Sequence, residues 1–299
     1  MSKGADLRGL ITAIFQRISP LEDDDLVFAG EVIGQFMDKN LSTAGSQAGI
    51  EVKESDFHSF ILYISAMVKR LTIIMPVYNE EATITRSVRG ILATKIKGVK
   101  LNLLVVNDGS TDKTKGELAK IKDRRVRVLQ HRHNLGKGAA VRTALESGWG
   151  DVFVIQDADL EYDPADLALL LAPILDGRAD VVFGSRFVGS GPHRILYFWH
   201  RIANQGITIL CDCFTNLNLT DVETGYKAFT GMVAKKLNLE ENRFGFDPEF
   251  TVKVAKMKAR IYEVGVSYSG RSYEEGKKIG WRDGLVAIWA IVKYSLRSA

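Results

Sequence analysis

Cysteine is scarce in this chain, which has only two among its 299 residues. Cys211 and Cys213 are separated by one residue, and a disulfide across that spacing has poor geometry. The five histidines are scattered and do not supply an obvious set of partners for a cysteine-bound zinc ion. We therefore expect both thiols to be reduced, which predicts a cytoplasmic protein.

Long apolar runs and a large excess of charge are also missing. No run of about 18 or more apolar residues and no signal peptide is visible, so we expect no membrane-spanning segment. The formal net charge of +4 is too small to indicate nucleic-acid binding, and no nucleic-acid partner is predicted. This charge suits an anionic substrate or an anionic membrane surface equally well.

The chain divides near residue 69. Before that point, apolar residues recur at helical spacing until Pro20, and the stretches 27–37 and 57–68 are also compatible with helices. We therefore expect an N-terminal helical extension over residues 1–69, which either binds a partner or packs on its neighbour. Residues 70–299 are expected to form one domain.

Apolar stretches alternate with helix-compatible stretches from Leu71 onward. Strands are expected at 71–77, 101–106, 126–129, 152–155 and 181–183. This alternation predicts an α/β fold, in which a mainly parallel sheet carries helices on both faces. Ligands of such sheets bind beyond the carboxyl ends of the strands, so polar residues at those ends are candidates for a site.

Two aspartates follow the fourth expected strand. Asp157 and Asp159 come directly after an apolar run and are separated by one residue. Side chains alternate along an extended segment, so both carboxylates can point the same way. Paired carboxylates suit Mg2+ or Mn2+, and such a metal can hold a diphosphate. The spacing alone is not specific, because Asp23 and Asp25 share it with no strand before them.

Two earlier strand ends carry acidic residues as well. Glu80 ends a turn after the first strand, and Asp108 follows the second. Each alone is typical of a turn with a helix cap, but together with the aspartate pair they present carboxylates toward one crevice. Both can accept hydrogen bonds from a base or a ribose. Lys137 lies between two glycines at a helix start, where backbone N–H groups favour anions.

The order of the motifs resembles the family 2 glycosyltransferases, and within them the branch of dolichyl-phosphate (polyprenyl-phosphate) mannose and glucose synthases. Along the chain the motifs run P-V-Y-N-E, N-D-G-S, H-N-L-G-K-G-A-A, D-A-D-L-E, G-S-R-F and E-T-G-Y-K-A-F. The resemblance covers about residues 71–273. It implies a GT-A fold and a metal-dependent, inverting transfer of one sugar from a nucleotide-sugar of the GDP-mannose or UDP-glucose type.

The resemblance also implies roles for single residues. The nucleoside would be held by Pro76, Tyr78, Glu80 and Asp108. Asp157 and Asp159 would bind the metal on the diphosphate, with Glu161 either a third ligand or a solvated surface acid. Arg186 would face the donor or acceptor phosphates, for which its planar fork is suited, unless it forms a surface salt bridge. Arg271, Lys277 and Lys278 form a basic cluster that either closes over the diphosphate or is solvated.

The chemical class of the acceptor can be predicted from the number of candidate general bases in the sequence. A hydroxyl acceptor needs a base, which contributes roughly 10²–10⁴ in rate. A phosphate monoester, with a second pKa near about 6, is already ionised at neutral pH. The sequence offers strong candidates for metal ligands and for phosphate-binding cations, but only Glu223 and Glu249 as candidate general bases. The residues predicted to be catalytic are Asp159, Arg186 and Glu249. The imbalance favours a lipid phosphate.

Two late segments, 194–214 and 281–296, combine aromatic and aliphatic residues with interrupting basic ones. They predict amphipathic helices that lie on a bilayer, and hence an enzyme peripherally associated with the membrane. Core packing or a homo-oligomer interface is the alternative. Two other functions remain open: transfer by the same fold to a hydroxyl, and a non-catalytic regulatory protein that binds nucleotide-sugars.

Overall fold

The computed structural model describes residues 69–148, 150–189, 194–195, 197–271, 274 and 281–297. The predicted helical extension over residues 1–69 lies outside the described residues except for its last position, so it stays a prediction.

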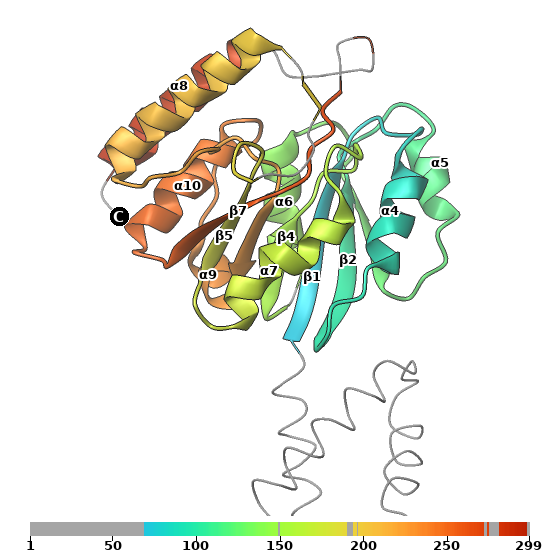
Figure 1. Cartoon of the computed structure of the whole chain (residues 1–299). Coiled ribbons are helices and arrows are strands. Elements are labelled where there is room, and N and C mark those ends of the chain that lie inside the picture. The colour runs from blue at the N-terminus through green and yellow to red at the C-terminus, as the bar shows by residue number, and fades with distance from the viewer. Residues whose placement is uncertain are drawn as a thin grey trace, which may run out of the picture. The chain divides into compact units, whose positions relative to one another are not determined.

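A seven-stranded sheet forms the centre of the described part (Figure 1). Its strands, in spatial order β3-β2-β1-β4-β6-β5-β7, are β1 (Lys69–Val77), β2 (Val99–Asn107), β3 (Val126–Gln130), β4 (Val152–Ile155), β5 (Val181–Ser185), β6 (Lys227–Thr230) and β7 (Ile261–Gly265). Parallel pairs join β1 to β4, β2 to β3 and β5 to β7, whereas β6 runs antiparallel to both its neighbours. The predicted mainly parallel sheet and its five predicted strands are confirmed, and β6 and β7 are additions.

Helices connect the strands and cover the sheet. They are α4 (Ile84–Ala93), α5 (Thr114–Ala119), α6 (Lys137–Ser147), α7 (Leu167–Leu175), α8 (Phe198–Thr215), α9 (Gly231–Lys236), α10 (Phe246–Lys256) and α11 (Trp281–Leu296). In α4 the apolar side chains of Ile84, Val88 and Ile91 recur at helical spacing and are buried against the sheet. Because helices cover the sheet, β4 reads as a continuous apolar run and every one of its residues is buried.

The two predicted amphipathic segments form α8 and α11. These helices pack against each other, and Figure 1 shows α11 in red beside α8. Both leave large apolar side chains in solvent, with Trp199 75% and Trp289 63% exposed. Within the described residues, none of the helices is both long and apolar enough to cross a bilayer.

Candidate active site

A cavity of about 1410 Å³ opens at the carboxyl ends of β1, β2, β4 and β5. One end is lined by the polar residues that follow these strands, and the other by apolar side chains of α8 and α11. The predicted residues on its wall are Pro76, Tyr78, Glu80, Asp108, Lys137, Asp157, Asp159, Glu161, Arg186 and Arg271. The parallel sheet thus brings together side chains that lie almost 200 positions apart in the chain, at the edge where the sequence predicted them.

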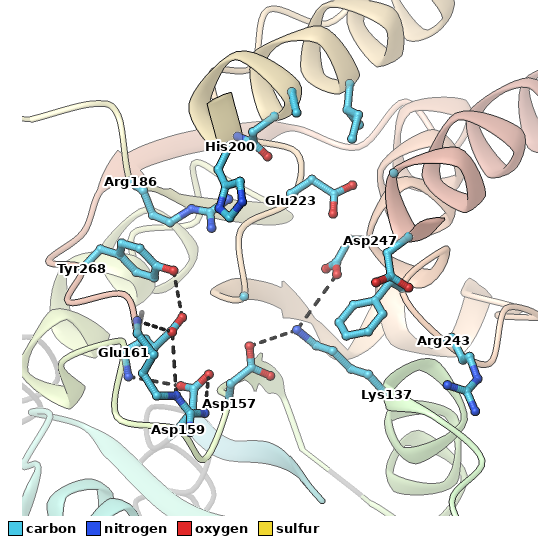
Figure 2. A pocket seen from close by; sticks show the side chains of 18 of the residues that line it. Lys137, Asp157, Asp159, Glu161, Arg186, His200, Glu223, Arg243, Asp247 and Tyr268 are labelled. Atoms are coloured by element: carbon cyan, nitrogen blue, oxygen red, sulfur yellow. Dashed lines mark hydrogen bonds and ion pairs between the residues drawn. The ribbon is translucent and has the colours of Figure 1, made fainter. Parts of the chain in front are cut away.

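Asp157, Asp159 and Glu161 gather at the polar end of the cavity (Figure 2), and Arg271 forms ion pairs with Asp159 and Glu161. The Nη2 atom of Arg271 lies 2.9 Å from Oε1 of Glu80 and 3.4 Å from Oδ2 of Asp159. Burial raises the pKa of Asp159 to about 7, and repulsion from Asp157 and Glu161 adds to the rise. Negative charge is therefore crowded here, and one guanidinium offsets only part of it. Such a set of carboxylate oxygens suits a hard divalent cation.

The carboxylate of Glu161 is hydrogen-bonded to groups of the protein itself. Its Oε2 accepts a hydrogen bond of 2.8 Å from the hydroxyl of Tyr268, and its Oε1 accepts one of 2.7 Å from the backbone N–H of Arg271. Among the described residues, no group of three or more Asp, Glu, His or Cys side chains is arranged to hold a metal ion. The structure therefore does not form the predicted three-carboxylate site, because Glu161 is already committed to other partners. Asp157 and Asp159 remain as the pair.

A chain of alternating charges continues from Asp157 along one wall. Lys137 Nζ donates to Asp157 Oδ2 at 3.0 Å and lies 4.0 Å from Oδ2 of Asp247. Burial lowers the pKa of Lys137, but the charges of Asp157 and Asp247 outweigh burial and hold the pKa well above its ordinary value. On the far side of Asp247, the fully buried Lys227 donates to its Oδ1 at 2.5 Å. Lys137 is thus a permanent cation beside the aspartate pair.

Asp108 holds the loop that leads into α6. Its carboxylate accepts hydrogen bonds from the backbone N–H groups of Leu135 at 2.9 Å and Gly136 at 2.7 Å, and it pairs with His131 Nδ1 at 2.6 Å. Gly136 has φ of 105°, a conformation that side chains resist, and a Cβ there would lie 2.3 Å from the backbone oxygen of Asn242. Most of the accepting capacity predicted for a base or ribose is therefore used by the protein itself, although Asp108 borders the cavity.

Arg186 lies on the opposite wall and is oriented by Asp221. Its Nε and Nη2 each lie 2.6 Å from an oxygen of that fully buried carboxylate. The ring of Tyr268 lies 5.2 Å from the guanidinium carbon. Within the described residues, Nη1 of Arg186 has no hydrogen-bond acceptor. The side chain is 18% exposed, so this is not a solvated surface salt bridge but a fixed cation at the cavity wall.

Glu249 does not reach the cavity. It is fully buried and accepts hydrogen bonds from the backbone N–H groups of Glu240 at 2.7 Å and Glu241 at 2.8 Å. Lys253 Nζ lies 2.6 Å from its Oε1. Both of its oxygens hold the segment before α10, so the predicted catalytic role of Glu249 is wrong. The predicted diphosphate-binding Lys277 lies outside the described residues.

Several cavity residues carried no functional prediction from the sequence. They are Tyr162, His200, Arg243, Asp247 and Tyr268. Lys227, which lies beneath the wall, belongs to the quoted motif E-T-G-Y-K-A-F. A lysine inside an otherwise apolar stretch was the available signal for it, because a buried lysine needs a carboxylate partner.

Comparisons with known proteins agree with this geometry. The family model described as "Glycosyl transferase family 2" matches residues 72–237. An undecaprenyl-phosphate mannosyltransferase of Micrococcus luteus is 31% identical, covering 71% of this chain and 88% of that protein. A dolichyl-phosphate beta-glucosyltransferase of Drosophila melanogaster is 32% identical, covering 67% of each chain.

A solved structure shows the likeness of fold. Glucosyl-3-phosphoglycerate synthase of Mycobacterium tuberculosis, crystallised with Mn2+, uridine diphosphate and phosphoglyceric acid, superposes with a TM-score of 0.61. It is 18% identical, and the match covers 85% of each chain. The predicted GT-A fold is confirmed.

Proposed function

The chain belongs to glycosyl transferase family 2, and we propose that it transfers one sugar from a nucleotide-sugar to a polyprenyl phosphate, as a cytoplasmic enzyme working at a membrane surface. The observation that carries this proposal is the two-ended cavity. Carboxylates gather at one end, apolar side chains of α8 and α11 line the other, and Arg186 is also part of the wall. Several relatives are named as mannosyl- or glucosyltransferases of dolichyl, dolichol or undecaprenyl phosphate, and they support the same pairing of substrates.

The polar end suits the donor. Pro76, Tyr78 and Glu80 would border the nucleoside, and Asp157 and Asp159 would hold Mg2+ or Mn2+ on the diphosphate. The metal fits because the ligands are all oxygens and because burial, together with repulsion from neighbouring carboxylates, raises the pKa of Asp159 to about 7. When bound, such an ion neutralises the departing nucleoside diphosphate. A synthase of similar fold crystallised with Mn2+ and UDP-glucose supports this assignment.

The apolar end suits the lipid acceptor. Apolar side chains line it, among them Ile195, Phe198, Ile207, Leu210, Leu285 and Ile288. Arg186 and Arg201 also line the cavity, and the phosphate of such a lipid would lie beside these cations. A phosphate oxygen would attack the anomeric carbon while the bond to the diphosphate breaks, and the leaving diphosphate keeps the electron pair. Because the phosphate is already ionised, this step needs no general base.

The exposed apolar residues of α8 and α11 support docking on a bilayer. Phe198 is 64% exposed, Ile209 64% and Leu285 57%, in addition to the two tryptophans. Interfacial helices bury such residues at the boundary between headgroups and acyl chains. Co-sedimentation with anionic vesicles tests this, with a Trp199→Ser and Trp289→Ser double variant expected to sediment less. A concentration-dependent dimer that the double variant abolishes, with no vesicle binding, would assign this face to a second copy instead.

A transfer assay tests the reaction itself. UDP- and GDP-sugars would be offered with a short polyprenyl phosphate in detergent, in the presence of Mn2+, Mg2+ or EDTA. Label should enter the organic phase only with metal and from one donor. Asp159→Asn should abolish transfer, whereas Asp176→Asn, at an exposed ion pair with Arg178, should leave it unchanged. Metal-dependent donor hydrolysis without a lipid product would rule out the acceptor, and no turnover of any donor would favour a regulatory protein.

A further inference from the structure

Glu223 lines the cavity, and one oxygen of its carboxyl is buried without a partner among the described residues. Figure 2 shows its side chain pointing into the cavity between His200 and Asp247. The Oε1 atom is inaccessible to solvent and has no hydrogen-bond partner among the described residues. Buried acceptors in native proteins are nearly always paired, since an unpaired one loses its bonds to water without compensation. The partly exposed carboxyl of Glu223 is therefore a candidate to form hydrogen bonds with a ligand.

The backbone on both sides of Glu223 is fixed. Lys227 Nζ donates to the carbonyl oxygens of Val222 and Thr224, which flank Glu223 in the chain. The N–H of Val222 donates to Thr208 Oγ1 at 3.3 Å, and the N–H of Gly225 donates to the hydroxyl of Tyr162 at 2.8 Å. The segment thus has its backbone groups satisfied by the protein, while the Glu223 oxygen is not. A polar side chain on a rigid support is what selective binding of a ligand requires.

The chemistry of a carboxyl oxygen limits its partner. It exchanges hydrogen bonds with hydroxyl groups in either protonation state but never carries a positive charge, so it suits the diphosphate and the lipid phosphate less well than the cations of the site do. Asp157 at the proposed diphosphate site is linked by Lys137 toward Asp247, which flanks Glu223 on the same wall. A sugar attached to that diphosphate is the group with hydroxyls to offer there. Resting on the proposed function, we infer that Glu223 binds a hydroxyl of the transferred sugar and so helps to select which sugar is used.

The protonation of Glu223 is consistent with this role. Burial, followed by repulsion from Asp247, raises the pKa of Glu223 to about 8. At neutral pH the carboxyl is then largely protonated, and it can donate to the sugar as well as accept from it. Glutamine offers the same combination of donor and acceptor in the same shape. Replacement by glutamine therefore separates hydroxyl binding from general-base catalysis, which glutamine cannot perform.

Two dissociation constants test the inference, one for the nucleotide-sugar and one for the matching nucleoside diphosphate, both with metal and without acceptor. Glu223→Ala should weaken nucleotide-sugar binding by about 10- to 100-fold, the value of one hydrogen bond to such a group. Binding of the nucleoside diphosphate should change by less than about threefold. Glu223→Gln should stay within about fivefold of the wild type for both ligands and keep most of its turnover.

A matched control perturbs the same segment from outside the cavity. Glu263 accepts hydrogen bonds from the N–H and hydroxyl of Thr220 and does not line the cavity. Glu263→Ala should therefore leave the ratio of the two dissociation constants unchanged. Where Glu223→Ala fails to fold, Glu223→Asp withdraws the oxygen by one methylene group and should show an intermediate weakening of nucleotide-sugar binding alone.

Three results would overturn the inference. Equal losses for both ligands in Glu223→Ala would make the residue structural. Normal nucleotide-sugar binding with a roughly thousandfold loss of turnover in both Glu223→Ala and Glu223→Gln would make it a general base, and the acceptor a hydroxyl. If the wild type bound neither ligand in the presence of metal, the proposed donor-binding site would be refuted, and the proposed role of Glu223 would be refuted as well.

Discussion

Lys137 Nζ lies 3.0 Å from Asp157 Oδ2, so the first residue of α6 is tied to the turn that follows β4. Asp247 at the start of α10 lies 4.0 Å from the same ammonium group. One lysine therefore holds three elements at the polar end of the cavity. Buried ion pairs of this kind contribute little net stability when intact, but removing one partner is costly because the remaining charge is left uncompensated.

Removal of the Lys137 charge should therefore destabilise the protein. We expect Lys137→Met to lower the free energy of unfolding by about 3 kcal/mol, since Asp157 loses its ion pair and Asp247 one of two nearby cations. Urea denaturation followed by circular dichroism measures the change. Lys115→Met, at an exposed position on α5, is the matched control and should stay within about 0.5 kcal/mol of the wild type. A loss below about 1 kcal/mol at Lys137 would contradict the buried-pair account.

Arg271 occupies the part of the site where the proposed metal would be held. Its guanidinium is hydrogen-bonded to Glu80 and lies 3.4 Å from Asp159, so it repels any cation that approaches that carboxylate. We expect Arg271→Ala to bind Mn2+ several-fold more tightly than the wild type in the absence of nucleotide, measured by calorimetry. Arg271→Lys keeps the charge and should resemble the wild type. Unchanged or weaker Mn2+ binding in the alanine variant would show that Arg271 does not compete with the metal.

The strands and the strand-end acids were predictable because they are local patterns. Each parallel strand is a short apolar run followed by polar residues, and parallel strands bring their carboxyl ends to one edge. β6 was not predictable in the same way. It has four residues and begins with Lys227, whose charge is compensated by Asp247 from a different element. The local sequence shows the lysine but not the distant aspartate that compensates its charge.

The error over Glu249 has a geometric cause. Asp247 and Glu249 both lie in the first turn of α10, and only Glu249 was predicted from the sequence to be functional. Positions two apart on an α-helix point in directions roughly 200° apart, so only one of them can face the cavity. The structure assigns that place to Asp247, while Glu249 holds the backbone of Glu240 and Glu241. The face that a helix turns to a site depends on its packing against other elements, which the local sequence does not encode.

Asp212 should make stability depend on pH. Burial raises the pKa of Asp212 to about 6, from an unperturbed value of 3.8. A carboxyl whose pKa is raised on folding stabilises the native state while it is protonated, and that contribution is lost as pH rises through about 6. Asp212→Asn keeps an acceptor for the N–H of Leu219 and cannot ionise.

We therefore expect Asp212→Asn to melt a few degrees above the wild type at pH 8, a gain of about 1 kcal/mol after allowance for partial exposure. At pH 4 the two proteins should melt together, because the wild-type side chain is then protonated as well. Thermal melts at both pH values measure this. A gain of the same size at pH 4 and pH 8 would show that the substitution acts through something other than the carboxyl charge.

Arg186 provides the sharpest test of where the acceptor binds. Asp221 holds Nε and Nη2 of its guanidinium at 2.6 Å each, and among the described residues Nη1 has no acceptor, which leaves it available for an anion. Arg186→Lys keeps one positive charge but cannot bind Asp221 and a phosphate in the same fixed geometry. We expect the KM for the lipid phosphate to rise about tenfold, equivalent to about 1.4 kcal/mol, while the dissociation constant of the nucleotide-sugar changes by less than about twofold.

The control for this substitution is Arg178→Lys, since Arg178 also pairs with an aspartate but lies in an exposed ion pair away from the cavity. It should change neither constant. Steady-state transfer assays with varied lipid phosphate, and calorimetry with the nucleotide-sugar, measure the two quantities separately. A weakening of nucleotide-sugar binding that matches the rise in KM would place Arg186 on the donor diphosphate instead. The lipid phosphate would then have to bind farther toward the apolar end, beside Arg201.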